Sequence, residues 1–470
     1  MKQRNPVQAG RSGDVFRSAN LVSSRSTDNV VYAASIYFLL HTMGSLGIID
    51  TLVYGPAWLG KSGDKITVAV NLLGIFVSVV LFLSGMRKTG NARFNKFIPL
   101  LAASFLLVSA FWSVDPRLSL SQGTAYFFVV IGAIGIALSL DGDELMDLLS
   151  WTCALSAVAS LLWQFVLFPA PAFNGVEPDF AGIFSQKNVL GLVMVGGVLA
   201  ALHSVRIREK GRLRYICIIA LCATVAFLSK SSTSVVAIAA LLCFDFLGRL
   251  YFRGGSYRAI SIFFLIVCLL ALIFFSMNDA LILELLGKDA TLTGRTLIWS
   301  YAIDNIYEKP LIGWGYAAFW VPANPAAAQI AEAINWTSPN AHNGLLEFLL
   351  DIGVLGTSLF LFLWIRYFVM ALKCMNGPAQ QFGLTAALVL ITILVIGISE
   401  EVVLSAQQIW TSLFFMTGFI CEKELGFARK AGRPGITRFV PSRARTISGG
   451  RSLSGGRGAY RLGVCDKRPA

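Results

Sequence analysis

Residues 381–399 read QFGLTAALVLITILVIGIS and contain no charged side chain. A helix rises about 1.5 Å per residue, so a run of this length spans roughly the 30 Å hydrocarbon core of a bilayer. Lipid offers no hydrogen-bond partners to backbone N–H and C=O groups, and an uninterrupted apolar run must therefore be helical to cross it. These residues predict a membrane-spanning helix.

Similar apolar runs recur along most of the chain, which is 56% hydrophobic and 14% charged, with a mean hydropathy of +0.68. This composition excludes a soluble globular protein. The predicted fold is an all-α, polytopic membrane helical bundle of about twelve transmembrane helices. The predicted spans are 30–50, 66–85, 97–113, 123–140, 149–168, 189–205, 215–229, 234–248, 258–277, 343–370, 381–399 and 404–421. The seventh and eighth are short, and a re-entrant pair is the alternative for them.

The distribution of Lys and Arg predicts the orientation of the bundle. Thirty-one of the 39 basic residues fall on one predicted side, which the positive-inside rule makes cytoplasmic. We therefore expect a cytoplasmic N-terminal segment (1–29), a transmembrane domain (30–421) containing one large periplasmic loop (277–341), and a basic cytoplasmic tail (422–470). The tail is rich in Arg, Gly and Ser, which predicts disorder and attraction to anionic membrane lipids rather than to nucleic acid.

The centres of the predicted spans carry almost no charge, whereas a transporter usually places ionisable groups along its path. The polar chemistry instead gathers in the outside loops. The 277–341 loop is far longer than an ordinary connection, and its tryptophans and helical patterning favour a folded segment.

The chain has three histidines, and His342 closes this loop within Asn340-Ala-His-Asn-Gly-Leu-Leu-Glu347. Asn340 is a predicted cap for a helix starting near His342, where backbone N–H donors and a base would face the outside. His41 is expected to be a packing residue and His203 a solvated one near the cytoplasmic end of its span.

Cations also gather in the outside segments. Arg295 follows Thr293 (a predicted N-cap) and shares a helical face with Trp299, while Lys187 and Asn188 enter the sixth span. Lys230 precedes a run of hydroxyl residues, a combination that suits a phosphate oxyanion. The alternatives are lipid-headgroup contacts for these cations and an aromatic belt for the tryptophans.

Glu400 and Glu401 occupy the last outside loop, either as part of a site or as a solvated pair. No outside cluster of His, Asp or Glu has metal-ligand spacing, so we expect neither a metal nor another cofactor.

Three motifs in order resemble the O-antigen ligase and polysaccharide polymerase superfamily, with the exopolysaccharide production proteins of the succinoglycan-polymerase type as the most similar subgroup. They are Gly294-Arg-x-x-x-Trp299, Pro310-Leu-Ile-Gly-Trp-Gly315 and Ala341-His-Asn-Gly-Leu-Leu-Glu-Phe-Leu-Leu-Asp-Ile-Gly-Val-Leu-Gly356. The resemblance covers roughly residues 180–405. It implies an all-helical bundle in the bacterial inner membrane that acts on glycans carried by undecaprenyl pyrophosphate.

The resemblance also implies roles for individual residues. His342 would deprotonate the acceptor hydroxyl, and Arg295 would pair with the pyrophosphate leaving group. Many relatives carry an arginine where this chain has Ser231-Ser232-Thr233, and Lys230 is the candidate replacement. Substrate contacts are expected from Lys187, Asn188, Lys230, Trp299, Asn343 and Glu400.

The function predicted on this basis is a metal-independent inverting glycosyltransferase that polymerises lipid-linked repeats into exopolysaccharide at the periplasmic face, alongside other export components. One alternative is a ligase that transfers the glycan to lipid A core or protein. Another is a non-enzymatic transporter or flippase of the lipid-linked glycan.

Overall fold

The computed structural model describes residues 29–45, 65–89, 97–167, 180–277, 295–335, 337–377 and 379–431. Within these residues every regular element is a helix, which confirms the all-α prediction. Most of the predicted N-terminal segment and basic tail, the first part of the large loop, Thr293 and Trp336 lie outside them.

A helix lies in each of the twelve predicted spans. They are residues 29–42, α3 (Lys65–Thr89), α4 (Phe97–Val108), α5 (Pro116–Ser139), α6 (Gly142–Leu162), α7 (Lys187–Ile207), α8 (Arg212–Leu228), α9 (Ser232–Phe252), α10 (Gly255–Met277), α14 (Gly344–Met375), α15 (Gln380–Gly397) and α16 (Ile409–Ala431). Of the helices in the described residues, seven are long and apolar enough to cross a membrane, namely α3, α5, α6, α7, α9, α14 and α15. The chain is a multi-pass membrane protein. The 21 residues of α9 favour a span over the re-entrant alternative.

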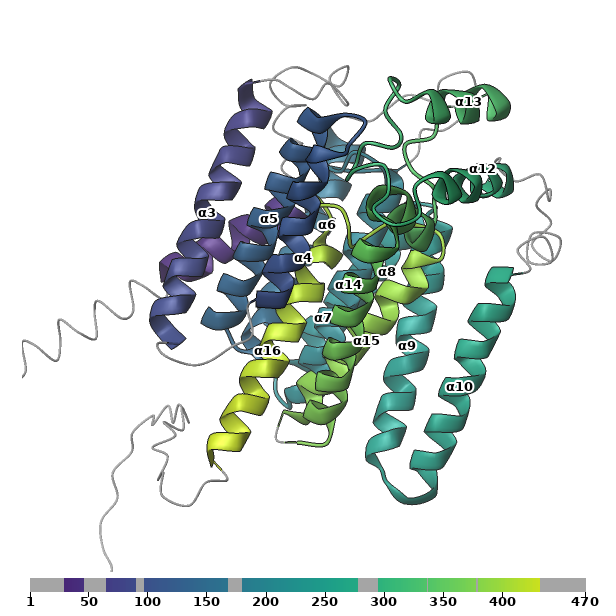
Figure 1. Ribbon diagram of the computed structural model, residues 1–470. Coiled ribbons are helices and arrows are strands. Elements are labelled where there is room, and N and C mark those ends of the chain that lie inside the picture. Colours follow the sequence, from purple (N-terminus) through teal and green to yellow (C-terminus); the bar gives the residue numbers. More distant parts are fainter. Residues whose placement is uncertain are drawn as a thin grey trace, which may run out of the picture. The chain divides into compact units, whose positions relative to one another are not determined.

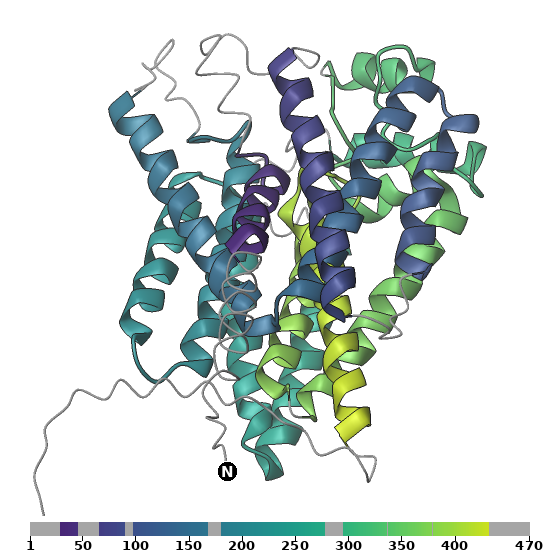
Figure 2. The same cartoon turned by 90° about the vertical axis from the view of Figure 1, so that its left-hand side faces the viewer.

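The long helices run side by side, as both ribbon views show (Figures 1 and 2). α7 is the most enclosed of the seven, and it packs against α6, α8, α9 and α15. We call the end of the bundle where α7, α9 and α14 begin the His342 end, and the end where α6 begins the opposite end.

Two further helices, α12 (Arg295–Glu308) and α13 (Pro325–Ile334), belong to the loop and lie at the His342 end (Figure 1). They share a small apolar core with the start of α14. Its buried members are Ile298, Ala302, Phe319, Ile330, Ala341 and Leu350. Because Ala341 belongs to this core, the loop is anchored at the residue directly before His342 and Asn343.

α14 is interrupted at Gly353, whose φ of 62° and ψ of −170° are not helical. The break removes helical partners from two N–H groups and two C=O groups, and the segment 310–315 supplies replacements. The N–H groups of Val354 and Leu355 donate to the Pro310 and Leu311 carbonyls at 2.8 and 3.0 Å. The Trp314 and Gly315 N–H groups donate to the Leu350 and Asp351 carbonyls at 2.7 and 3.0 Å.

Glycine is required on both sides of this junction. A Cβ on Gly353 would lie 2.4 Å from the Leu311 carbonyl carbon, and one on Gly313 would lie 2.5 Å from the Leu350 oxygen. Both glycines also have positive φ. Gly313 and Gly353, which belong to two of the sequence motifs, thus allow close backbone packing, and the prediction of one uninterrupted helix over 343–370 is wrong at Gly353.

At the opposite end, the prediction that His203 is solvated is wrong. Its side chain is fully buried, with Nδ1 2.7 Å from Thr385 Oγ1 and Nε2 2.9 Å from Asp143 Oδ1. Asp143 lies in the first turn of α6, where Asp141 and Glu144 form a capping box. The imidazole is buried because α15 and the start of α6 both close over the end of α7.

Candidate functional site

Two asparagine side chains fix the turn that carries His342, directly before α14. Asn343 is the N-cap, and its Oδ1 accepts from the Leu345 and Leu346 N–H groups at 3.0 and 3.1 Å. The prediction that Asn340 caps the helix is therefore wrong. Asn340 Oδ1 instead accepts from the His342 N–H at 2.9 Å, one turn too early for a helix cap.

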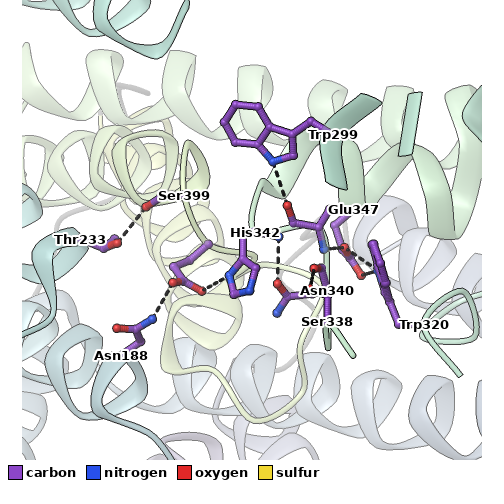
Figure 3. A network of polar contacts seen from close by, with 11 residues as sticks. Asn188, Thr233, Trp299, Trp320, Ser338, Asn340, His342, Glu347 and Ser399 are labelled. Carbon is purple, nitrogen blue, oxygen red and sulfur yellow. Dashed lines mark hydrogen bonds and ion pairs between the residues drawn. The ribbon is translucent and has the colours of Figure 1, made fainter. Parts of the chain in front are cut away.

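His342 has a φ of 49°, a left-handed conformation that is unusual outside glycine. Consequently it precedes the helix rather than opening it. Trp299, on α12, donates its indole N–H to the Ala341 carbonyl at 2.9 Å, which ties the turn to the loop helix (Figure 3). The structure thus places Trp299 beside the turn formed by His342 and Asn343.

The imidazole of His342 faces the carboxylate of Glu400, with Nδ1 3.8 Å from Oε2. The other carboxylate oxygen accepts from Asn188 Nδ2 at 2.7 Å. Figure 3 shows Asn188 on one side of His342 and Glu347 on the other. The chain Asn188–Glu400–His342 thus joins the first turn of α7, the loop after α15 and the turn before α14.

Glu400 is buried, with 8% of its surface exposed, so the solvated alternative does not describe it. The backbone of Glu400 packs closely against Gly344. A Cβ added to Gly344 would lie 3.2 Å from the Gly397 carbonyl oxygen and 3.4 Å from the Glu400 carbonyl oxygen. The next residue, Glu401, lies among other acids. Burial, followed by the negative charge of Glu347, raises the pKa of Glu401 to about 8.

Two predicted cations lie at the starts of helices at the His342 end. Lys187 is the first residue of α7, directly before Asn188. Lys230 is exposed in a left-handed turn before Ser231, the N-cap of α9. Thr233 Oγ1 lies 2.9 Å from Ser399 Oγ, so this helix start adjoins the residue before Glu400 (Figure 3).

Arg295 is the first residue of α12, one turn before Trp299. The position of its side chain lies outside what the structure describes, so the predicted pairing of Arg295 with a leaving group stays a prediction. Its backbone shares the arrangement of the lysines, at the start of a helix whose N-terminal dipole favours an anion.

An apolar cavity of about 380 Å³ opens beside these residues, between α14 and α15. Trp299, Asn343 and Glu400 line its polar part. Apart from Thr357, the remaining lining is apolar and includes Leu345, Phe348, Phe360, Leu361, Trp364, Ile393, Leu394 and Phe414. The arrangement places a base–carboxylate pair beside a groove that suits a hydrocarbon chain.

Sequence reasoning missed Ser399 and Thr233, which join two helix ends, and Glu347, which contacts the backbone of the His342 turn. The position of Glu347, five residues after His342, could have indicated its role. A carboxylate in the first turn of a helix lies close to the backbone N–H groups at the start of that helix. The Ser399–Thr233 contact joins segments far apart in the chain and left no local pattern.

Comparisons with known proteins support the resemblance. A model of the O-antigen ligase family matches residues 217–361. The chain is 31% identical over 280 residues to the exopolysaccharide production protein ExoQ of Rhizobium meliloti (strain 1021). That alignment covers 57% of this chain and 63% of the relative, so the chain spans somewhat less than two thirds of the protein it matches. These matches confirm the similarity to O-antigen ligase and exopolysaccharide production proteins.

Proposed function

We propose that this chain, similar over residues 217–361 to the O-antigen ligase family, is a glycosyltransferase that joins undecaprenyl-pyrophosphate-linked repeats into an exopolysaccharide. The observation that carries the proposal is the contact of His342 with Glu400, which itself lines an apolar cavity. A base beside a hydrophobic groove suits a substrate with sugar hydroxyls and a lipid tail. We place the reaction at the periplasmic face of the inner membrane, with both termini in the cytoplasm.

In the proposed reaction an acceptor hydroxyl oxygen attacks the anomeric carbon of the donor sugar from the face opposite the pyrophosphate. The new C–O bond forms as the bond to the pyrophosphate oxygen breaks, and that oxygen leaves with the electron pair. Nε2 of His342 accepts the hydroxyl proton. Glu400 faces Nδ1 and favours the tautomer with its proton there, which leaves Nε2 as the basic nitrogen.

Asn188 has a supporting part in this reaction. Its amide donates to the Glu400 oxygen that does not face His342, so the carboxylate keeps one oxygen toward the ring. The distance of 3.8 Å from Nδ1 to Oε2 is longer than a hydrogen bond. We expect it to shorten when substrate fills the site, as catalytic contacts commonly do.

Lys187, Lys230 and Arg295 are the proposed partners of the pyrophosphate. Each stands at or just before the start of a helix, where charge and helix dipole both favour phosphate oxygens. Trp299 and Asn343 line the cavity mouth and would contact the sugars nearest the lipid. The apolar remainder of the cavity would hold the first part of the polyprenyl tail.

The test is a strain in which the native protein is replaced by His342→Ala or Arg295→Ala. The proposal expects loss of polymer and accumulation of single lipid-linked repeats on the outer face of the membrane. Accumulation on the inner face would instead identify the function as flipping. Full polymer production by both variants would place the active site elsewhere.

Ligation is the second candidate, because the matching family model describes an O-antigen ligase. Chain-length analysis of the accumulated lipid separates the two. Loss of a polymerase leaves single repeats on the lipid, whereas loss of a ligase leaves long chains there.

The proposed reaction needs no metal ion. Among the residues that the structure describes, no group of three or more His, Cys, Asp or Glu side chains is arranged to hold one. The direct test is transfer by the purified protein in EDTA, which should proceed at the rate seen without chelator. Loss of transfer that added Mg²⁺ or Mn²⁺ restores would show a metal-dependent reaction.

A further inference from the structure

The backbone before His342 is held from two sides by side chains of other segments. The Ala341 N–H donates to Glu347 Oε2 at 2.7 Å, and the Ala341 carbonyl accepts from Trp299 Nε1 at 2.9 Å. These two bonds fix the peptide groups on either side of Ala341. The orientation of the next residue, His342, follows from theirs.

Glu347 is itself held in place. Its carboxylate is buried, with 7% of the residue exposed, and both oxygens lie 3.1 Å from Trp320 Nε1. One indole N–H thus bridges the two oxygens while the second donor is the Ala341 backbone. Hydrogen bonds to a carboxylate are stronger than neutral ones, and a buried N–H group left without an acceptor is destabilising.

The turn needs such a restraint because of its own geometry. A left-handed residue with a side chain is held there only when its surroundings determine it. The His342 N–H bond to Asn340 is local and would survive many arrangements of the ring. The bond to Glu347 is different, because it ties the turn to the rigid first turn of α14.

Figure 3 shows Glu347 and Trp320 on the side of His342 away from Asn188. Glu347 contacts the backbone of the turn through the Ala341 N–H, and it is not among the residues that line the cavity. Through this backbone contact Glu347 acts on the orientation of His342.

We propose that Glu347, oriented by Trp320, is a positioning residue that sets the His342 ring against Glu400. Its kinetic consequence rests on the proposed function, but its structural consequence does not. Replacing Glu347 by leucine removes the acceptor of the Ala341 N–H, so the turn relaxes and the ring leaves the alignment that it has with Glu400. An error of about 1 Å at a reacting group can cost on the order of 100-fold in rate.

The experiment combines kinetics with NMR on the full-length protein in lipid nanodiscs. Because the chain has three histidines, ¹⁵N-labelled imidazoles give three sets of signals, and His342→Ala identifies those of His342. Transfer is measured with lipid-linked repeats extracted from the His342→Ala strain. The variants are Glu347→Leu, Glu347→Gln and Trp320→Phe.

For Glu347→Leu we expect kcat to fall on the order of 100-fold with KM for the donor little changed. The ¹⁵N signals of His342 should move while those of His41 and His203 stay. Glu347→Gln keeps an oxygen acceptor for the Ala341 N–H and should recover most of kcat. Trp320→Phe keeps the Glu347 carboxylate but removes the hydrogen bond that orients it. This variant should lose less kcat than Glu347→Leu and should shift the same His342 signals.

The matched control is Trp112→Phe. It removes an indole N–H that donates to the Ile312 carbonyl at 3.0 Å in the same outer region, without touching the His342 turn. It should leave both kcat and the His342 signals unchanged.

Three results would overturn the proposal. The first is unchanged His342 signals in both Glu347→Leu and Trp320→Phe. The second is movement of all three histidine signals in Trp320→Phe, which would show general loosening. The third is full kcat in Glu347→Leu. If the wild type itself transfers nothing, the proposed function fails, and the NMR result still decides whether Glu347 positions His342.

Discussion

A histidine lies beside a carboxylate at each end of the bundle, and the two histidines differ in how accessible they are. His203 at the opposite end is fully buried, and its two ring nitrogens contact Thr385 and Asp143 at hydrogen-bond distance. At the His342 end the ring retains 15% of its side-chain exposure and stands 3.8 Å from a carboxylate that lines a cavity. A buried imidazole whose two nitrogens both have hydrogen-bond partners can hold helices together but cannot contact a substrate.

The largest expected effect is on the rate at the His342 end. His342→Ala should lower glycan transfer on the order of 10³-fold, because the base that accepts the acceptor proton is lost. The comparison variant is His203→Ala. It should reduce the free energy of unfolding by about 2 kcal/mol, because Asp143 and Thr385 lose a partner, while the transfer rate per folded molecule stays the same. Equal losses of rate in the two variants would erase the distinction between the ends.

The next effect concerns the two carboxylates. Glu400→Gln should lower kcat about 10- to 100-fold, since an amide orients and polarises His342 less well than a carboxylate does. Asp143→Asn makes the same chemical change beside His203. Transfer kinetics of the two purified variants provide the measurement, and a kinetic defect in Asp143→Asn would contradict the structural role given to that end.

A smaller effect should follow from filling the cavity. Gly397 lines it, and nothing lies within 4 Å of an added Cβ there. Gly397→Leu should therefore fold and raise KM for the lipid-linked donor about tenfold, equivalent to 1.4 kcal/mol of binding. Gly426→Leu is the matched control, because its Cβ also meets nothing within 4 Å and it lies far along α16. An unchanged KM in Gly397→Leu would remove the cavity from the donor site.

The smallest effect is on stability near Glu401. Its pKa of about 8 lies above the ordinary 4.5, so the folded state favours the protonated form. The resulting stability is complete below about pH 4.5 and is lost as the pH rises through about 8. Glu401→Gln should remove this dependence and raise Tm at pH 8.5 by about 2–4 °C. Thermal unfolding between pH 5 and pH 9 tests it, and parallel pH profiles for wild type and variant would refute it.

Much of the fold follows from local patterns in the sequence. Each predicted span contains a helix because an apolar run in lipid has no alternative that pairs its backbone. The break at Gly353 could not be predicted in this way, because it depends on a loop some forty residues earlier that supplies the missing partners. Hydropathy depends only on composition, and the residues of α14 are apolar on both sides of Gly353, so the hydropathy of the chain does not indicate the break.

For the candidate site too, local patterns predicted some features and contacts between distant segments decided the others. His342, Asn343, Trp299 and Glu400 were predicted, and the structure brings them to one region. The wrong predictions concern features that depend on residues from other parts of the fold or on backbone conformation. Asn340 and Asn343 are both good caps in sequence, and only the left-handed φ of His342 decides between them. Likewise His203 is solvated or buried according to whether α15 covers it, which no local pattern records.

The interrupted helix has a consequence for how the chain is made. Residues 310–315, which supply partners to the N–H groups of Val354 and Leu355, are synthesised before α14. The segment that pairs with the break is therefore already made when α14 is completed. A circular permutant that moved the loop behind α14 would make the helix first, with those groups still unpaired. Chain order, and not only the final contacts, makes this break tolerable in a membrane.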